Sequence, residues 1–373
     1  MFKAGTYKQH YQYKSFLPTL LEKPFQWQSD TVLELLPEAS LYIGELNSYA
    51  DLVPDVNFFI EMHKVKEATT SSRIEGTRAN IDEAVLSENN IPVEKRDDWE
   101  EVRNYIRALN YAIDWMQELP LSMRLVKETH AILLSGVRGE YKLPGEIRRS
   151  QNWIGGADIK SATFIPPAEV DLPELLSDLE KFWNGGTRQM PTLIRIAVSH
   201  YQFETIHPFL DGNGRIGRLL ITLQLLQSQP MAKPVLYLSD FFERNRMEYY
   251  QALERVRFSN SLDQWLRFFL TGVIQTAQNS KKTFVEIGKL RDRYQERIRS
   301  LGKREKLAKE FLLQLYSAPI ISPREAEQKL GVTAATANRL IAELEKLGVL
   351  QEKTGYSRNR LYALHEYLEI FRQ

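Results

Sequence analysis

The sequence predicts a mainly α-helical protein with one short β-hairpin and a C-terminal winged-helix domain. Apolar residues recur at helical spacing in most segments, for example in the run Val102, Tyr105, Ile106, Leu109 and Ile113. Strand signals are few, and the sequence has neither an internal repeat nor a low-complexity segment. With 373 residues, of which 43% are hydrophobic, the chain can bury a sizeable core and divide into two or three domains.

The charge and the cysteine content narrow the functional class. The chain has 49 Lys and Arg residues against 48 Asp and Glu residues, so no overall field favours nucleic acid or an anionic membrane. It contains no cysteine, which excludes disulfides, thiolate zinc sites and cysteine nucleophiles and is typical of a reducing compartment. Residues 1–16 lack a signal-peptide pattern, and no uninterrupted run of about 18 apolar residues occurs. We therefore expect a soluble, cytoplasmic protein that does not bind membranes.

Residues 1–115 are predicted to form an N-terminal helical region. Short amphipathic runs follow one another, and one of them begins near Phe58. Read as a helix, this run places Ser71 and Glu75 one turn apart on the same face, with Gly76 positioned to end the helix. Taken alone, these three residues are most simply interpreted as a surface helix end.

Residues 116–280 are predicted to form a second helical region that contains a hairpin and a glycine-rich loop. The hairpin would pair residues 152–154 with residues 163–165 across a long connection. One helix is expected to end near Ile206 and the next to begin near Gly214. The residues between these two helices form the loop.

Residues 281–305 are predicted to be a helical connector, and residues 306–373 the winged-helix domain. Ser322 has the features of a helix N-cap, because a proline follows it and Glu325 occupies the third helical position. A second helix is expected near Thr333, and two short strands separated by a glycine should follow. Helix, turn, helix and wing is the winged-helix order.

The winged-helix domain has residues that could face a DNA groove, yet its charge is nearly balanced. From Ile321 to Gln373 there are eight Lys and Arg residues against seven Asp and Glu residues. Specific DNA binding normally depends on a clear basic face, so protein docking and weak DNA binding both stay open. The candidate contact residues are Ala335, Thr336, Asn338 and Arg339 of the second helix and Lys353, Arg358 and Arg360 of the wing.

The segment from His207 to Arg218 combines an imidazole, a carboxylate, three glycines and two arginines. Backbone N–H groups at the start of a helix are unpaired within the helix, and the helix dipole favours an anion there. The glycines allow the backbone to approach such an anion closely. Arg215 and Arg218 are three residues apart, so both can reach the same side of this helix start. The pattern predicts a site for a nucleotide polyphosphate.

Two further side chains of this segment could supply chemistry. Asp211 could hold Mg²⁺ against phosphates, since Mg²⁺ usually takes one or two carboxylates together with phosphate oxygens and waters. His207 could remove the proton from an attacking hydroxyl, because the ordinary pKa of an imidazole lies near neutral pH. Taken singly, each residue is more often structural, and it is the combination at this spacing that indicates function.

The same segment resembles the signature of the Fic family, His-Pro-Phe-x-Asp/Glu-Gly-Asn-Gly-Arg-x-x-Arg, without a departure. The resemblance extends from the N-terminal helices to about Leu270, and longer family members also carry a C-terminal winged helix. It implies a Fic helical core. It also implies transfer of AMP from ATP to a Ser, Thr or Tyr hydroxyl of a protein target or of the enzyme itself.

The resemblance also implies a role for each position of the signature. His207 would deprotonate the target hydroxyl, and Asp211 would bind Mg²⁺ at the α- and β-phosphates. Residues 212–214 would form the anion hole, Arg215 would hold the phosphates, and Arg218 would take the γ-phosphate. The implied nucleotide-binding residues are Glu75, His207, Gly212, Asn213, Gly214, Arg215, Ile216, Gly217, Arg218 and Tyr250.

The helix end at Ser71, Glu75 and Gly76 can be interpreted further once the loop is assigned to this family by resemblance. It resembles the inhibitory motif of the family, Ser/Thr-x-x-x-Glu-Gly/Asn, in the version that lies N-terminal to the catalytic loop. Glu75 could form a bidentate pair with Arg218 and occupy the place of the γ-phosphate, so that bound ATP is not aligned for attack. In some relatives this glutamate also supports the removal of AMP.

The hairpin resembles the flap of the family, which aligns the main chain of the target beside the active site. An exposed strand edge can do this through backbone hydrogen bonds and therefore accept varied sequences. The predicted docking residues are Ile154, Thr163, Phe164 and Ile165.

Other functions are compatible with the same residues. A transcriptional regulator could use a Fic-like domain to sense a nucleotide without catalysis, although a pure sensor would not need His207. A Fic enzyme could also transfer UMP, GMP, phosphate or phosphocholine, but the two arginines together with Asp211 favour nucleotidyl transfer. The family resemblance makes a homodimer plausible.

Overall fold

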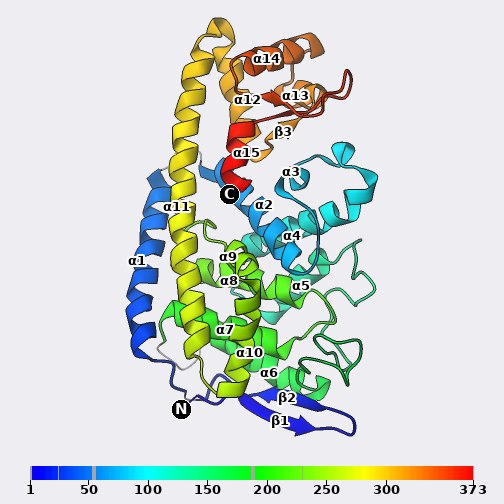
Figure 1. Ribbon diagram of the computed structural model, residues 1–373, viewed down its shortest axis with the longest axis vertical. Coiled ribbons are helices and arrows are strands. Elements are labelled where there is room, and N and C mark those ends of the chain that lie inside the picture. The colour runs from blue at the N-terminus through cyan, green and yellow to red at the C-terminus, as the bar shows by residue number, and fades with distance from the viewer. Residues whose placement is uncertain (1, 24, 53–55, 186–189, 229, 373) are drawn as a thin grey trace.

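The computed structural model of the protein describes residues 2–23, 25–52, 56–185, 190–228 and 230–372. Helices form most of this part of the chain, and strands are confined to small antiparallel sheets (Figure 1). The prediction of a mainly α-helical fold is confirmed. Among these residues, no helix has the length and the apolar character needed to cross a membrane.

The first part of the chain builds an N-terminal hairpin and a group of helices around the long helix α2. Its elements are β1 (Gly5–Gln9), β2 (Lys14–Pro18), α1 (Asp30–Leu52), α2 (Val56–Ile74), α3 (Ile81–Ala84), the 3₁₀ helices η1 (Glu88–Asn90) and η2 (Val93–Lys95), α4 (Arg96–Trp115) and α5 (Met123–Leu133). The sequence did not predict the β1–β2 hairpin, whose five residue pairs run from Gly5 opposite Pro18 to Gln9 opposite Lys14.

The middle of the chain holds the loop singled out by the sequence. Its elements are η3 (Glu169–Asp171), α6 (Leu172–Trp183), α7 (Thr192–Ile206), α8 (Asn213–Gln227), α9 (Ser239–Arg244), α10 (Arg246–Ser259) and α11 (Asp263–Arg299). Nearly every side chain of α7 and α8 is buried. Both helices carry buried polar as well as apolar side chains, so packing on several sides holds the connection between α7 and α8.

The longest helix, α11, has 37 residues and lies along α1 (Figure 1). It runs through residue 280 without a break, so most of the predicted connector is the outer half of this helix. The 3₁₀ helix η4 (Gly302–Arg304) follows it and leads into α12 (Glu305–Ser317), and residues 303–306 at this junction are all charged.

We call residues 305–372 the C-terminal module. Besides α12 it contains β3 (Ile320–Ile321), α13 (Pro323–Leu330), α14 (Ala334–Lys346), β4 (Gln351–Glu352), β5 (Tyr362–Ala363) and α15 (His365–Arg372). The three strands form an antiparallel sheet in the order β3-β5-β4. Ser322 and Glu325 form the expected capping box at the start of α13. The predicted helices and strands occur in the predicted order as α13, α14, β4 and β5, whereas α12, β3 and α15 were not predicted. The winged-helix assignment stays a prediction.

Candidate active site

The loop between α7 and α8 is held in a tight, strained conformation. His207 ends α7 with φ at +50°, and Gly212 precedes α8 with φ at +75°. The side chain of Asn213 closes the loop, because its Oδ1 accepts from Phe209 N and its Nδ2 donates to Phe209 O, both at 2.9 Å. Asn213 therefore has a structural role in addition to its predicted place in an anion hole.

Two buried side chains outside the signature position this loop. His130 Nδ1 accepts from Gly145 N at 2.8 Å, so Nε2 carries the proton and donates to the Asp211 carbonyl at 2.9 Å. Its ring stacks on Phe209 with 3.8 Å between the ring centres. Burial lowers the pKa of His130 to about 4, so the ring is neutral near pH 7.

Arg148 is the second of these side chains, and it is 2% exposed. Its guanidinium donates to the carbonyls of His207 at 3.0 Å and Pro167 at 2.6 Å, which ties the loop to the end of the flap. Asn152 Nδ2 also donates to the His207 carbonyl, at 3.2 Å. These bonds fix a residue whose left-handed backbone would otherwise be disfavoured.

The imidazole of His207 can accept a proton. Burial, followed by the charge of Arg148, lowers its pKa to about 4, so the ring is neutral near pH 7. Its Nδ1 atom has no hydrogen-bond partner among the residues that the structure describes.

Arg215 is a buried cation whose donors are largely unused. Its side chain is 4% exposed, and its Nε and Nη1 atoms have no hydrogen-bond partner within the described ranges. Glu101 lies 3.6 Å from Nη1 and Asp211 lies 3.9 Å from Nη2, both longer than hydrogen bonds. A buried guanidinium with free donors at a helix start suits a polyanion.

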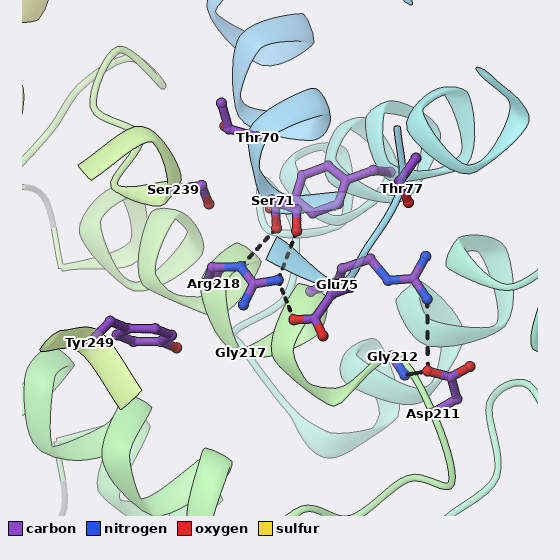
Figure 2. Close-up of polar contacts among 12 residues, drawn as sticks. Thr70, Ser71, Glu75, Thr77, Asp211, Gly212, Gly217, Arg218, Ser239 and Tyr249 are labelled. Atoms are coloured by element: carbon purple, nitrogen blue, oxygen red, sulfur yellow. Dashed lines mark hydrogen bonds and ion pairs between the residues drawn. The ribbon is translucent and has the colours of Figure 1, made fainter. Parts of the chain in front are cut away.

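Arg218, by contrast, makes three hydrogen bonds, and its partners lie at the end of α2 (Figure 2). Its Nη2 donates to Glu75 Oε1 at 2.7 Å and to the Ser71 carbonyl at 2.9 Å, and its Nε donates to Ser71 Oγ at 2.9 Å. The expected contact between Glu75 and Arg218 is therefore present, but one carboxylate oxygen makes it. The predicted bidentate geometry is wrong, because Arg218 contacts Glu75 through Nη2 alone and directs its Nε to Ser71.

The carboxylate of Glu75 lies at the start of α8. A Cβ atom on Gly214 would be 2.2 Å from Glu75 Oε1, so only a glycine leaves room for it. Burial alone would raise the pKa of Glu75, but the charge of Arg218 outweighs it and holds that pKa below its usual value. An ionised carboxylate thus occupies the position where the helix dipole favours an anion. Gly76 ends the segment with φ at +103°.

A buried hydrogen-bond network supports α2 two turns before Glu75. Glu67 Oε1 accepts from Tyr105 OH at 2.9 Å and from Ser239 Oγ at 2.6 Å. Burial raises the pKa of Glu67. The network links α2 to α4 and α9, so the end of α2 is held laterally.

The other predicted nucleotide-binding residues differ in how far their side chains are exposed. Ile216 is 1% exposed and points into the core, and Gly217 packs against Glu204. Tyr250 is 44% exposed, with Arg246 5.9 Å from its ring centre. Tyr250 is therefore available to a ligand, whereas Ile216 could contribute through its backbone alone.

Asp211 fits a metal ion that is held jointly with phosphates. Its side chain is 42% exposed, and its Oδ1 accepts from Gly212 N at 2.6 Å (Figure 2). No group of three or more potential metal-ligating side chains occurs in the described part of the chain. One accessible carboxylate beside an anion site is a donor set that suits Mg²⁺ accompanied by phosphate oxygens and waters.

The predicted hairpin is reduced to a single bridge between Ile154 and Phe164. Ile154 N donates to Phe164 O at 2.8 Å, and Thr163 N donates to Ile154 O at 2.9 Å. The residue after Phe164 pairs with the N-terminal hairpin instead, because Phe16 N of β2 donates to Ile165 O at 2.9 Å. The N-terminal hairpin therefore supports the flap, and target docking at this segment stays a prediction.

The candidate DNA contacts are mostly exposed but partly neutralised. Asn338, Arg339, Arg358 and Arg360 are exposed. Arg339 lies 3.5 Å from Glu343 in an ion pair. DNA binding and protein docking remain predictions.

Glu204 is a further acidic side chain beside Arg218, and it should make stability depend on pH. Burial raises its pKa to about 7, and Glu75 adds to this effect while Arg218 opposes it. The folded state then holds a proton that the unfolded state loses near pH 4.5, so the free energy of unfolding should fall as pH rises from about 4.5 to 7.

We expect Glu204→Gln to remove this decrease in the free energy of unfolding with rising pH. The variant and the wild type should be about equally stable at pH 5, and the variant more stable by about 1–3 kcal/mol at pH 8. Urea unfolding at both pH values measures the difference. A stability difference that does not change with pH would contradict the assignment.

Comparison with known proteins identifies two domains. Residues 33–114 match the family model described as Fic/DOC family N-terminal, and residues 120–225 match the model described as Fic/DOC family. Among curated proteins, protein adenylyltransferase Fic of Drosophila ananassae is 29% identical over 171 residues, which are 45% of this chain and 30% of the relative. Protein adenylyltransferase fic-1 of Caenorhabditis briggsae is 30% identical over 151 residues, 40% of this chain and 26% of the relative. The chain thus matches about a third or less of the length of these relatives.

Solved structures share the fold. A Fic family protein from Desulfovibrio desulfuricans has a TM-score of 0.60 at 19% identity, and the match covers 91% of this chain and 98% of that chain. A Fic domain containing signaling protein from Bacteroides thetaiotaomicron has a TM-score of 0.53 at 20% identity, with coverage of 68% and 96%.

Proposed function

We propose that this chain, which contains both domains of the Fic/DOC family, transfers AMP from ATP to a Ser, Thr or Tyr hydroxyl of a protein. The single observation that carries the proposal is the arrangement at the start of α8. A buried arginine with unused donors and a neutral histidine meet there beside a helix start made accessible by glycine. The relatives named as protein adenylyltransferases support the same reaction.

Each residue of the loop has a task in this reaction. Arg215 and the N–H groups at the start of α8 would hold the phosphates of ATP. His207 would take the proton of the target hydroxyl, whose oxygen attacks the α-phosphorus while pyrophosphate leaves. Asp211 would hold Mg²⁺, which offsets the negative charge of the phosphates when it is bound. Tyr250, exposed beside the loop, would cover the adenine.

The contact between Glu75 and Arg218 would keep the enzyme inactive. While Glu75 binds Arg218, that arginine cannot bind the γ-phosphate, and a carboxylate stands where the phosphate would lie. The like charges would push the triphosphate out of line for attack. Release of Glu75 would restore both the cation and the space.

The nature of the transferred group is tested with labelled ATP on the Glu75→Gly variant. Protein labelled from [α-³²P]ATP and not from [γ-³²P]ATP is the expected result, with a mass gain of AMP. Label from the γ-phosphate would indicate phosphate transfer. ATP binding without label, in the presence of a cell extract as a source of targets, would favour the nucleotide-sensing regulator. AMP removal is tested on the wild type, which retains Glu75, and loss of a preformed AMP adduct there would indicate this activity.

A further inference from the structure

The helix that carries the inhibitory residues is attached at its other end to the C-terminal module. Phe59 of α2 packs on Tyr316 of α12, with 5.2 Å between the ring centres. One turn further along α2, His63 packs edge-on against Phe371 of α15 at 5.3 Å. Figure 1 shows α2 leading from the module toward the centre of the protein. The module therefore holds the upstream side of the inhibitory segment.

The downstream side is attached to the same module. Asp82 of α3 accepts from Arg372 of α15, with Nε to Oδ1 at 2.9 Å and a second contact from Nη2 to Oδ2. Asn90 Nδ2 donates to both carboxylate oxygens of Glu325 at 3.2 Å. Glu325 also accepts from the backbone of the N-cap residue Ser322 in the capping box of α13, so its position is fixed by the module.

Glu75 therefore lies between two attachments to one body. From His63 to its last residue, Ile74, the helix extends about 17 Å at about 1.5 Å per residue, and Glu75 follows directly. The helix backbone is hydrogen-bonded throughout, so the helix moves as a rod, and a shift of the module at His63 would tilt the helix about the Glu67 network that holds it laterally. Asp82 lies only seven residues beyond Glu75, across the Gly76 turn. A shift of the module would move both sides of this turn.

We propose that the C-terminal module sets how firmly Glu75 is held on Arg218, so that displacement of the module releases AMP transfer. This regulation rests on the proposed function. The module needs no contact with the loop, because it acts through α2 and α3.

The contact between the module and α2 contains features that lower the free-energy cost of separating them. Phe371 lines a cavity of about 110 Å³ together with several polar side chains, among them Thr70 of α2 and Ser280 of α11. His63 lines it too, and its Nε2 atom has no hydrogen-bond partner among the described residues although the side chain is buried. Unpaired buried polar groups weaken packing, so the module can leave α2 at lower cost than a fully apolar seam would allow.

The ion pair between Asp82 and Arg372 offers a test that keeps the core intact. The variants are Arg372→Asp, Asp82→Arg and the double charge swap, each made in the wild type and in Glu75→Gly. We expect either single change to raise the rate of AMP transfer about twofold to fivefold in the wild type, and the swap to reverse this. In the Glu75→Gly background none of them should change the rate, because no inhibition is left to release.

Lys309→Ala is the matched control. Lys309 pairs with Glu305 at 2.6 Å within α12, and this pair does not attach the module to another part of the protein, so the rate should not change. Phe371→Ala is the second variant and should raise the rate further, with unfolding curves to show that the chain stays folded. Hydrogen exchange at residues 71–76 should speed up in the activated variants.

The outcomes separate the two proposals. If Glu75→Gly is active but Arg372→Asp, Asp82→Arg and folded Phe371→Ala keep the wild-type rate, the module does not regulate inhibition. Equal changes in both backgrounds would also overturn this inference, since the effect would then bypass Glu75. If Glu75→Gly itself transfers no AMP, the proposed function fails instead.

Discussion

Glu75→Gly is expected to raise the rate of AMP transfer by about 10²-fold, the size of effect that misplacement of a reacting group by about 1 Å can produce. The change removes the oxygen that Arg218 Nη2 contacts at 2.7 Å and the carboxylate that stands over Gly214. Ser71 keeps its two contacts with Arg218, at 2.9 Å each, so the guanidinium stays near its position. The variant thus frees a preformed phosphate site and does not have to build one.

The measurement is incorporation of label from [α-³²P]ATP at saturating ATP and Mg²⁺. Glu75→Gln retains the shape of the side chain without its charge and should give an intermediate rate. Glu100→Ala is the matched control, because it removes a carboxylate that pairs with Arg107 at 2.8 Å within α4 and contacts neither the loop nor the inhibitory segment. Rates for Glu75→Gly and Glu75→Gln that equal the wild type would show that this carboxylate does not inhibit.

The loop could be predicted from the sequence because its determinants are local. Glycines, a helix start and two arginines at a spacing of three follow one another along the chain, and each has a physical meaning at that position. The contact between Glu75 and Arg218 spans 143 residues and was expected only because the Ser71–Gly76 segment resembles a known inhibitory motif. From spacing and periodicity alone, the Ser71–Gly76 segment would have been interpreted only as a helix end.

The sequence did not predict the two side chains that hold the loop, because they are far from it along the chain. His130 and Arg148 reach Asp211 and His207 from 81 and 59 residues away, and neither belongs to a local pattern. Their partners are backbone carbonyls, which every residue has, so no residue type in the loop signals their presence. Glu101 beside Arg215 is a similar case.

Short strands also could not be predicted from the local sequence. The β1–β2 hairpin pairs only five residues on each strand, and its place depends on Phe16 N donating to Ile165 O of the flap. The flap itself keeps one bridge where a longer hairpin was expected. Strand formation depends on neighbours across the sheet more than on the residues themselves, so short pairs escape prediction. The long helices were easier, because apolar periodicity over several turns identifies them.

His207→Ala is expected to lower AMP transfer by about 10²- to 10⁴-fold, the usual range for loss of a general base. The imidazole suits this role because burial and the charge of Arg148 lower its pKa to about 4, which leaves it unprotonated near neutral pH. Since the base acts when neutral, the rate should stay level as pH falls from 8 toward 5 and should decline only as the pKa is approached. A histidine with its ordinary pKa would lose activity near pH 6.5 instead.

The loss should be measured in the Glu75→Gly background, where the wild-type loop is active. ATP binding should persist, because Arg215 and the start of α8 are unchanged and the carbonyl of residue 207 still accepts from Arg148. His365→Ala is the matched control, since that histidine belongs to the distant C-terminal module. Substantial transfer by the Glu75→Gly/His207→Ala protein would mean that another group, or water, takes the proton. A matching loss of ATP affinity would mean that His207 holds the loop and does not act as its base.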